Sequence, residues 1–196
     1  MQPFFSPTRS RHVLAVFGLF AAFSGAAFAQ APAPAPLQTP KPHYVSIPME
    51  IAVNRPAAEV WKRVGKYCDL QEWLQVPCVI TSGKNDEAGS VRSLRNGAVI
   101  EILVAKTALS YTYTQPVREG VQYNLYHGTV EAVPVSATTS KLVYTLVLDN
   151  SMLADDAARD KDIQQRTTQF TRALNNMKTL AGGGTLPPPA APGPGR

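Results

Sequence analysis

The feature that most constrains the fold is a long stretch of helical periodicity near the C-terminal end of the chain, Leu153–Ala181. Mostly apolar residues recur within it at intervals of three and four: Ile163, Thr167, Phe170, Leu174, Met177 and Ala181. This spacing predicts an amphipathic helix, and it continues over too few heptads to favour a coiled coil. Aspartates cluster in the first turns, where the helix dipole favours negative charge, and Gly182 supplies a C-terminal stop. A helix about 40 Å long cannot bury its apolar side alone, so it needs a broad apolar surface to pack on.

Segments with strand-like composition, joined by short turns, precede this helix. They are Tyr44–Val53, Cys78–Ser82, Ser90–Arg95, Ala98–Lys106, Leu109–Gln115, Val121–Val133 and Thr139–Asp149. Pro48 favours an edge position for the first strand, and Asn96-Gly97 predicts a two-residue hairpin turn. Two short helices are also expected, one with Pro56 at its first position and one over Asp69–Leu74 with Asp69 as its cap. This order predicts an antiparallel sheet that wraps around the last helix.

The two ends of the chain lack the composition of a folded domain. Residues 1–29 combine arginines, an apolar run and the pattern Ala27-Phe28-Ala29, which predicts a signal peptide and an exported protein, periplasmic or secreted. A retained membrane anchor is the alternative, but the apolar run is short for a membrane span, so we expect no transmembrane segment after cleavage. Residues 30–42 are a Pro/Ala-rich linker, and residues 182–196 are expected to be a disordered Gly/Pro-rich tail. One domain remains, residues 43–181.

Charge and cysteine content narrow the class of partner. Removing residues 1–29 lowers the net charge from +5 to +3, which is 17 basic minus 14 acidic residues. The basic residues are scattered and no nucleic-acid motif accompanies them, so we expect no nucleic-acid partner. Cys68 and Cys78 would meet an oxidising compartment after export and are predicted to form a disulfide, with two buried free thiols as the alternative.

Several segments, in order, are similar to one known family. VNRPAAEVWKRVGKYCDLQEWL resembles the opening of the SRPBCC superfamily, the START-related helix-grip proteins that include pollen-allergen-like proteins, abscisic-acid receptors and polyketide cyclases/dehydratases. The later segments AGSVRSLRNG, VIEIL, LSYTY and YHGTVEAVP, and the closing ALNNMKTLA, resemble the strands and last helix that follow. The resemblance implies an α+β helix-grip fold, in which a seven-stranded antiparallel sheet encloses the C-terminal helix and an internal cavity lies between them. It says little about chemistry, because ligands and activities differ widely among these proteins.

Strand alternation indicates which side chains face the helix. Tyr111 and Tyr113 share one face of their strand, and Tyr144 and Leu146 share the corresponding face of the last strand. An inward phenol brings a hydroxyl that needs a partner, so these tyrosines either line a ligand pocket or reach a cavity rim and water. Gly128 would leave room where a ligand approaches the sheet. The residues predicted to line the pocket are Trp73, Glu101, Leu103, Tyr111, Tyr113, Tyr126, Gly128, Tyr144, Leu146, Phe170 and Leu174.

Glu101 is the most informative polar residue, because it lies in an apolar strand and because the corresponding acidic position in the family faces the cavity. Buried there, its carboxylate needs a cation, and Arg92 or Arg95 across the hairpin could supply one. The carboxylate is then either half of a structural ion pair, or a polar anchor or general acid/base for a ligand. An inward Glu101 places Ile100, Ile102 and Val104 on the outer face, which would leave an apolar stripe there.

The motifs that are absent limit the functional classes. The sequence has no metal-ligand cluster, no nucleophile elbow and no glycine-rich phosphate loop, so we expect no metal and no cofactor. The leading hypothesis is an exported binding protein, without catalysis, that holds a small hydrophobic molecule or lipid. One alternative is a cyclase/dehydratase-type enzyme that uses Glu101 with a cavity tyrosine such as Tyr126. The other is an interaction module with a filled core, which would form a homodimer through the outer sheet face.

Overall fold

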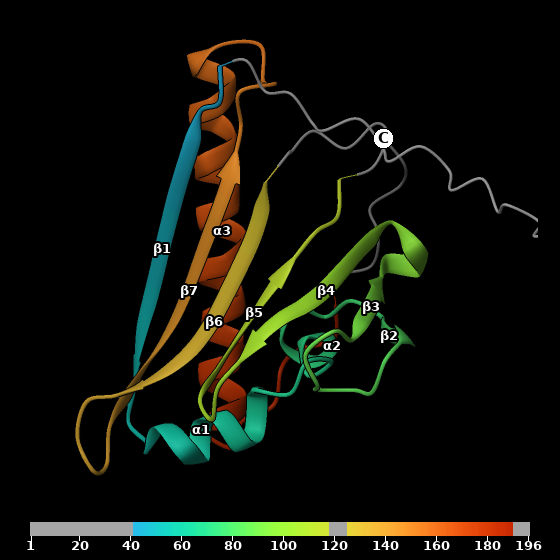
Figure 1. Cartoon of the computed structure of the whole chain (residues 1–196). Helices are drawn as coiled ribbons and strands as arrows, with labels where there is room; N and C mark the ends of the chain where they lie inside the picture. The colour runs from blue at the N-terminus through green and yellow to red at the C-terminus, as the bar shows by residue number, and fades with distance from the viewer. Residues whose placement is uncertain (1–40, 118–124, 190–196) are drawn as a thin grey trace, which may run out of the picture. The chain divides into compact units, whose positions relative to one another are not determined.

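A single seven-stranded antiparallel sheet lies along one long helix, α3 (Figure 1). The computed structural model describes residues 41–117 and 125–189. The elements run in the order β1 (Tyr44–Val53), α1 (Ala57–Val64), α2 (Leu70–Trp73), β2 (Cys78–Ser82), β3 (Val91–Leu94), β4 (Val99–Lys106), β5 (Ser110–Thr114), β6 (Tyr126–Pro134), β7 (Ser140–Asp149) and α3 (Asp156–Ala181). This is the α+β helix-grip order expected from the sequence, and the fold prediction is confirmed.

The strand order in the sheet is β1-β7-β6-β5-β4-β3-β2. Successive strands from β2 to β7 are neighbours, whereas β1 pairs with β7 over its full length, from Tyr44 opposite Asp149 to Val53 opposite Ser140. The first strand is therefore an edge strand, and Pro48, which has no amide hydrogen to donate, is tolerated there as predicted. Figure 1 shows α3 lying behind β1, β7 and β6, with α1 across one end of the helix.

The apolar side of α3 becomes more deeply buried toward its C-terminal end. Ile163 and Thr167 are half-buried, whereas the predicted residues further along are buried: Phe170, Leu174, Met177 and Ala181. Each large side chain so buried stabilises the fold by about 1.5–3 kcal/mol. Asp155 caps the helix, since its carboxylate accepts a hydrogen bond from the backbone amide of Ala158 at 2.8 Å.

Three local expectations need correction. The turn between β3 and β4 contains four residues instead of two, because Arg95–Gly97 forms a 3₁₀ turn and Leu94 pairs with Val99. Pro56 precedes the first residue of α1 and occupies its N-cap, where its missing amide hydrogen is equally harmless. Asp69 stands at the N-cap of α2, but its carboxylate accepts from the backbone amide of Lys66 and makes no capping bond to the helix.

One disulfide and the first residues after α3 make further contacts that hold the domain together. Cys68 and Cys78 form a disulfide with 5.8 Å between their Cα atoms, which joins the segment before α2 to the start of β2. After α3, the first residues of the expected tail stay against the domain: Leu186 packs on the core, and the carbonyl of Pro187 accepts from the side-chain amide of Gln75 at 2.6 Å. Some predicted segments lie outside the described residues. They are the signal peptide, residues 30–40 of the linker, the start of the strand predicted from Val121 and residues 190–196 of the tail. In the part that is described, no helix has the length and apolar character needed to cross a membrane.

The outer face of the sheet carries the apolar side chains predicted for it. Ile100 and Ile102 are half-buried, and Val104 is 46% exposed. A β-bulge in β4 between Leu103 and Ala105 shifts the pairing with β5 at Val104, the last residue of this stripe. A homodimer through this face stays a prediction.

Candidate functional site

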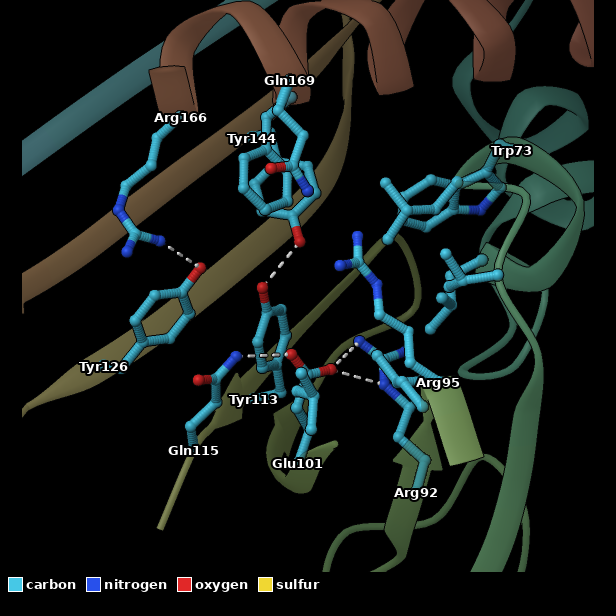
Figure 2. Close-up of a pocket in the computed structure, with 16 residues that line it drawn as sticks. Trp73, Arg92, Arg95, Glu101, Tyr113, Gln115, Tyr126, Tyr144, Arg166 and Gln169 are labelled. Atoms are coloured by element: carbon cyan, nitrogen blue, oxygen red, sulfur yellow. Dashed lines mark hydrogen bonds and ion pairs between the residues drawn. The ribbon is translucent and has the colours of Figure 1, made fainter. Parts of the chain in front are cut away.

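A cavity of about 220 Å³ lies between the sheet and the middle of α3 (Figure 2). Its walls come from α2, from strands β3 to β7 and from α3, so residues far apart in the sequence meet around it. Six of the residues predicted for the pocket line it: Trp73, Glu101, Tyr113, Tyr126, Tyr144 and Phe170. The others are buried in the surrounding core and do not line the cavity: Leu103, Tyr111, Gly128, Leu146 and Leu174.

Aromatic rings form much of the wall. The ring of Tyr144 lies 4.6 Å from that of Phe170 and 6.4 Å from that of Trp73, measured between centroids. Tyr111 does not line the cavity. Its ring is buried in the core and packs edge-on against the ring of Tyr67, with 5.5 Å between the two centroids. Aromatic contacts of this kind add about 0.5–1.5 kcal/mol each beyond the area they bury, so the wall is held in one arrangement.

Tyr113 and Tyr144 satisfy each other's hydroxyls. Their oxygens are 2.7 Å apart, and both side chains are buried. Tyr113 lies on β5 and Tyr144 on β7, so the ring of Tyr113 must cross the intervening strand β6 to make this bond. It crosses at Gly128, its register partner, where an added Cβ would come within 2.4 Å of the ring. The space left by Gly128 is therefore used by Tyr113, and our expectation that it admits a ligand to the sheet is wrong.

Glu101 is half of a buried ion pair with Arg92. Nε of Arg92 donates to Oε2 of Glu101 at 2.7 Å, and Nη2 lies 2.6 Å from the same oxygen. The other oxygen, Oε1, accepts from the side-chain amide of Gln115 at 3.0 Å (Figure 2). Arg92 and Glu101 are 1% and 3% exposed and stand opposite each other in the register of β3 and β4. Of the two cations that the sequence left open, Arg92 is the partner, and both carboxylate oxygens are occupied.

Aromatic rings complete the surroundings of Arg92. The guanidinium carbon lies 3.9 Å from the centroid of the Tyr67 ring and 5.0 Å from that of Tyr113, and Nη1 also donates to the backbone carbonyl of Tyr67. Burial by itself would lower the pKa of Arg92, but the carboxylate of Glu101 and the surrounding tyrosines together outweigh burial and raise the pKa above its ordinary value. The guanidinium therefore stays charged, and the pair is a fixed part of the wall.

The buried phenols of the wall stay protonated. Burial raises the pKa of Tyr113 and of Tyr144 well above the ordinary value, because the phenolate would lose its hydration, and burial likewise raises the pKa of Tyr67 and of Tyr111. Neutral phenols can donate a hydrogen bond but cannot act as bases near neutral pH.

Arg166 joins α3 to the sheet at the edge of the cavity. Its Nη1 donates to the hydroxyl of Tyr126 at 3.2 Å, and its Nε donates to Oδ2 of Asp162, one helical turn earlier, at 2.9 Å. Figure 2 shows the Arg166 side chain reaching from the helix toward Tyr126 on β6. Arg166 thus links Tyr126 on β6 to α3, and its positive charge is paired with Asp162.

Sequence reasoning missed a further group of lining residues: Leu70, Leu74, Val76, Leu94, Arg95, Val99, Gln115, Arg166 and Gln169. Two of them carried a signal, since Leu94 shares the inward face of β3 with Arg92, and Val99 shares the inward face of β4 with Glu101. Residues such as Val76 come from irregular connections, for which alternation gives no direction. Among residues 41–117 and 125–189, no group of three histidine, cysteine or acidic side chains could hold a metal ion.

The comparisons with known proteins follow this geometry. A family model described as "Polyketide cyclase / dehydrase and lipid transport" matches residues 44–182. No curated protein sequence is significantly similar to the chain. A Thermobifida fusca protein solved by solution NMR is 22% identical, with a TM-score of 0.60 over 70% of this chain and 93% of that one. The Zhui aromatase/cyclase from Streptomyces sp. R1128 is 16% identical, with a TM-score of 0.55 over 71% and 94%. Truncated norcoclaurine synthase from Thalictrum flavum is 10% identical, with a TM-score of 0.52 over 74% and 97%. At these identities the solved structures share the fold alone.

Proposed function

The chain belongs to the polyketide cyclase / dehydrase and lipid transport family, and on that premise we propose that it is an exported binding protein that holds a small hydrophobic molecule between the sheet and α3. The observation that carries the proposal is the cavity, whose polar groups are largely paired with one another. Tyr113 bonds to Tyr144, and Glu101 bonds to Arg92 and Gln115. Because these polar groups already have partners, they offer a ligand few free hydrogen bonds, and the aromatic and aliphatic side chains of the wall favour a hydrophobic occupant.

The size of the cavity narrows the ligand. An engineered apolar cavity of about 150 Å³ in another protein binds benzene, whereas sites for drug-sized ligands span about 300–1,000 Å³. A cavity of about 220 Å³ therefore suits a molecule of one or two rings, or a short aliphatic chain. A diacyl lipid would need far more room, so of the two ligand classes predicted from the sequence the small molecule is favoured.

Binding is favoured over catalysis by the state of Glu101. A general acid/base must be able to exchange a proton with a substrate held within hydrogen-bond reach. Here both oxygens of Glu101 already accept hydrogen bonds, one from the guanidinium of Arg92 and the other from the side-chain amide of Gln115. The tyrosines around it are neutral, and Tyr113 and Tyr144 spend their hydroxyls on each other. These paired groups support a structural role for the polar side chains of the wall and a binding function for the cavity.

The test is to titrate the full chain with a neutral two-ring probe, naphthalene-2-carboxamide, and to measure binding by isothermal titration calorimetry. The variant Val99→Trp places a large side chain at a position that lines the cavity, and Val104→Trp makes the same change on the same strand at an exposed position. We expect saturable binding that Val99→Trp weakens by about tenfold or more and Val104→Trp leaves unchanged. Absence of binding to the unaltered chain, or equal binding by both variants, would contradict the proposal. Circular dichroism checks that both variants fold.

A further inference from the structure

The mouth of the cavity carries a positive charge that no described acidic side chain balances. The charged residues that line the cavity are Arg92, Arg95, Arg166 and Glu101. Arg92 is paired with Glu101, and Arg166 with Asp162. Within the described ranges, 41–117 and 125–189, no carboxylate lies at ion-pair distance from Arg95. Among the described residues that line the cavity, Glu101 is the one acid, and it is paired with Arg92, so no acid of the wall remains to balance the guanidinium of Arg95.

Arg95 faces both the cavity and solvent. It is exposed, yet it lines the cavity, and Figure 2 shows its guanidinium turned into the space near Trp73 and Tyr144. A second hollow of about 260 Å³ adjoins the cavity through Trp73, Arg95 and Gln169, and it is lined in addition by Arg172 of α3. Arg172 is exposed and, like Arg95, has no acidic partner in the part of the chain that the structure describes. Two unbalanced guanidinium groups therefore border one opening.

The backbone of Arg95 adopts an unfavourable conformation. Its φ of +50° and that of Asn96, +56°, lie in the left-handed region, which a long side chain such as arginine rarely adopts. The turn is fixed from outside as well, since the amide of Arg95 donates to the carbonyl of Pro77 at 3.3 Å. Strained backbone that the surroundings maintain is concentrated at functional sites, and here it is what aims a cation at the cavity.

From these observations we propose that the ligand is a small hydrophobic acid, whose carboxylate sits at the mouth between Arg95 and Arg172 and whose ring or chain enters the cavity. This inference rests on the proposed function and specifies its ligand class. A carboxylate matches the planar fork of a guanidinium and gains charge-assisted hydrogen bonds, which are stronger at a partly enclosed site than in open water. An uncharged ligand would leave both cations unbalanced.

The test compares two probes of nearly equal shape, naphthalene-2-carboxylate and naphthalene-2-carboxamide, on the full chain by calorimetry at pH 7. We expect the acid to bind about tenfold or more tightly than the amide, since hydrogen bonds to charged groups are the stronger class. Arg95→Gln should remove most of that preference while the affinity for the amide stays the same, and Arg95→Lys should restore part of it. Arg172→Gln should give a smaller loss of the same kind. Lys178→Gln, which removes an exposed cation of α3 outside the cavity, is the matched control and should change neither affinity.

The outcomes separate the two proposals. Equal affinities for acid and amide, or a preference that Arg95→Gln leaves intact, would overturn the acidic ligand and leave the hydrophobic binding site standing. Failure of both probes to bind would overturn both proposals. Salt provides a second readout, because raising the ionic strength should weaken binding of the acid and spare the amide.

Discussion

The ring of Tyr113 lies against Gly128, its register partner on the neighbouring strand, so closely that a Cβ at position 128 would come within 2.4 Å of it. This contact lets the phenol cross β6 and bond to Tyr144 on β7. One missing side chain thus sets the position of two aromatic walls of the cavity.

Gly128→Ala should therefore destabilise the domain. The added methyl group would overlap the Tyr113 ring, and such overpacking destabilises by about 1–3 kcal/mol. Urea unfolding followed by circular dichroism measures the change. In a Tyr113→Ala background the same substitution should have little effect, because the ring it meets is gone. Effects that add without coupling would show that the two residues do not constrain each other.

Glu101→Gln should be among the most destabilising conservative substitutions in the chain. It leaves the buried guanidinium of Arg92 without its counter-charge, a change that typically destabilises by about 3–5 kcal/mol. The matched control is Glu50→Gln, which breaks the exposed pair with Lys141 and should change stability by no more than about 1 kcal/mol. Similar unfolding free energies for the two variants would remove the structural role that we assign to Glu101.

Stability should fall in alkaline solution as the buried phenols are forced to ionise. The pKa of Tyr113 and of Tyr144 is raised in the folded state by burial, whereas an unfolded chain titrates its tyrosines near the usual value of about 10. Below that value the contribution is fully present, and it is lost as the pH rises from about 10 toward the folded-state values, since the unfolded state releases its protons first. Urea unfolding between pH 8 and 11 should show this decline, and Tyr113→Phe should make it shallower. An unchanged slope in that variant would argue against a contribution from Tyr113.

Reduction of the disulfide should weaken the region that supports α2. Cys68 and Cys78 enclose a short loop, for which the chain-entropy model gives about 2–3 kcal/mol. Dithiothreitol should lower the urea midpoint of the unaltered chain, and it should leave that of a Cys68→Ser/Cys78→Ser double variant unchanged. A reductant effect of equal size on both would point to a cause other than this bond.

Export remains a proposal, and the chain offers a direct check. N-terminal sequencing of the protein recovered from its native host should begin at Gln30, if Ala27-Phe28-Ala29 is the cleavage pattern. A mature N-terminus at Met1 would contradict cleavage and favour a retained anchor or a protein that stays inside the cell.

Alternation and turn chemistry were sufficient to predict the order of elements and the inward faces of the strands. They placed Tyr113 and Tyr144 inside because each shares a parity with apolar neighbours, the family resemblance placed Glu101 inside, and the structure buries all three. They could not choose between Arg92 and Arg95 as the partner of Glu101. In the structure Arg92 stands opposite Glu101 in the register of β3 and β4, whereas Arg95 lies in the turn between these strands, where alternation gives a side chain no direction.

The cavity was harder to predict than the fold, for a physical reason. Leu103 and Leu174 point inward as strongly as Trp73 does, and alternation treats all inward residues alike. Whether an inward side chain meets a void or another side chain depends on how α2 and α3 pack against the strands. In the same way, the sequence predicted free space beside Gly128, but the register of β5 and β6 decides that the Tyr113 ring fills it.

The pairing of β1 with β7 has a consequence for the order in which the chain can assemble. The first strand has no neighbour until the last one has been synthesised, because Tyr44 pairs with Asp149 and α3 follows only after that. A nascent chain emerging from the ribosome therefore cannot close its sheet early, and such long-range pairings slow folding. We expect the polypeptide to remain open until synthesis is nearly complete, which is the state that a narrow translocation channel requires.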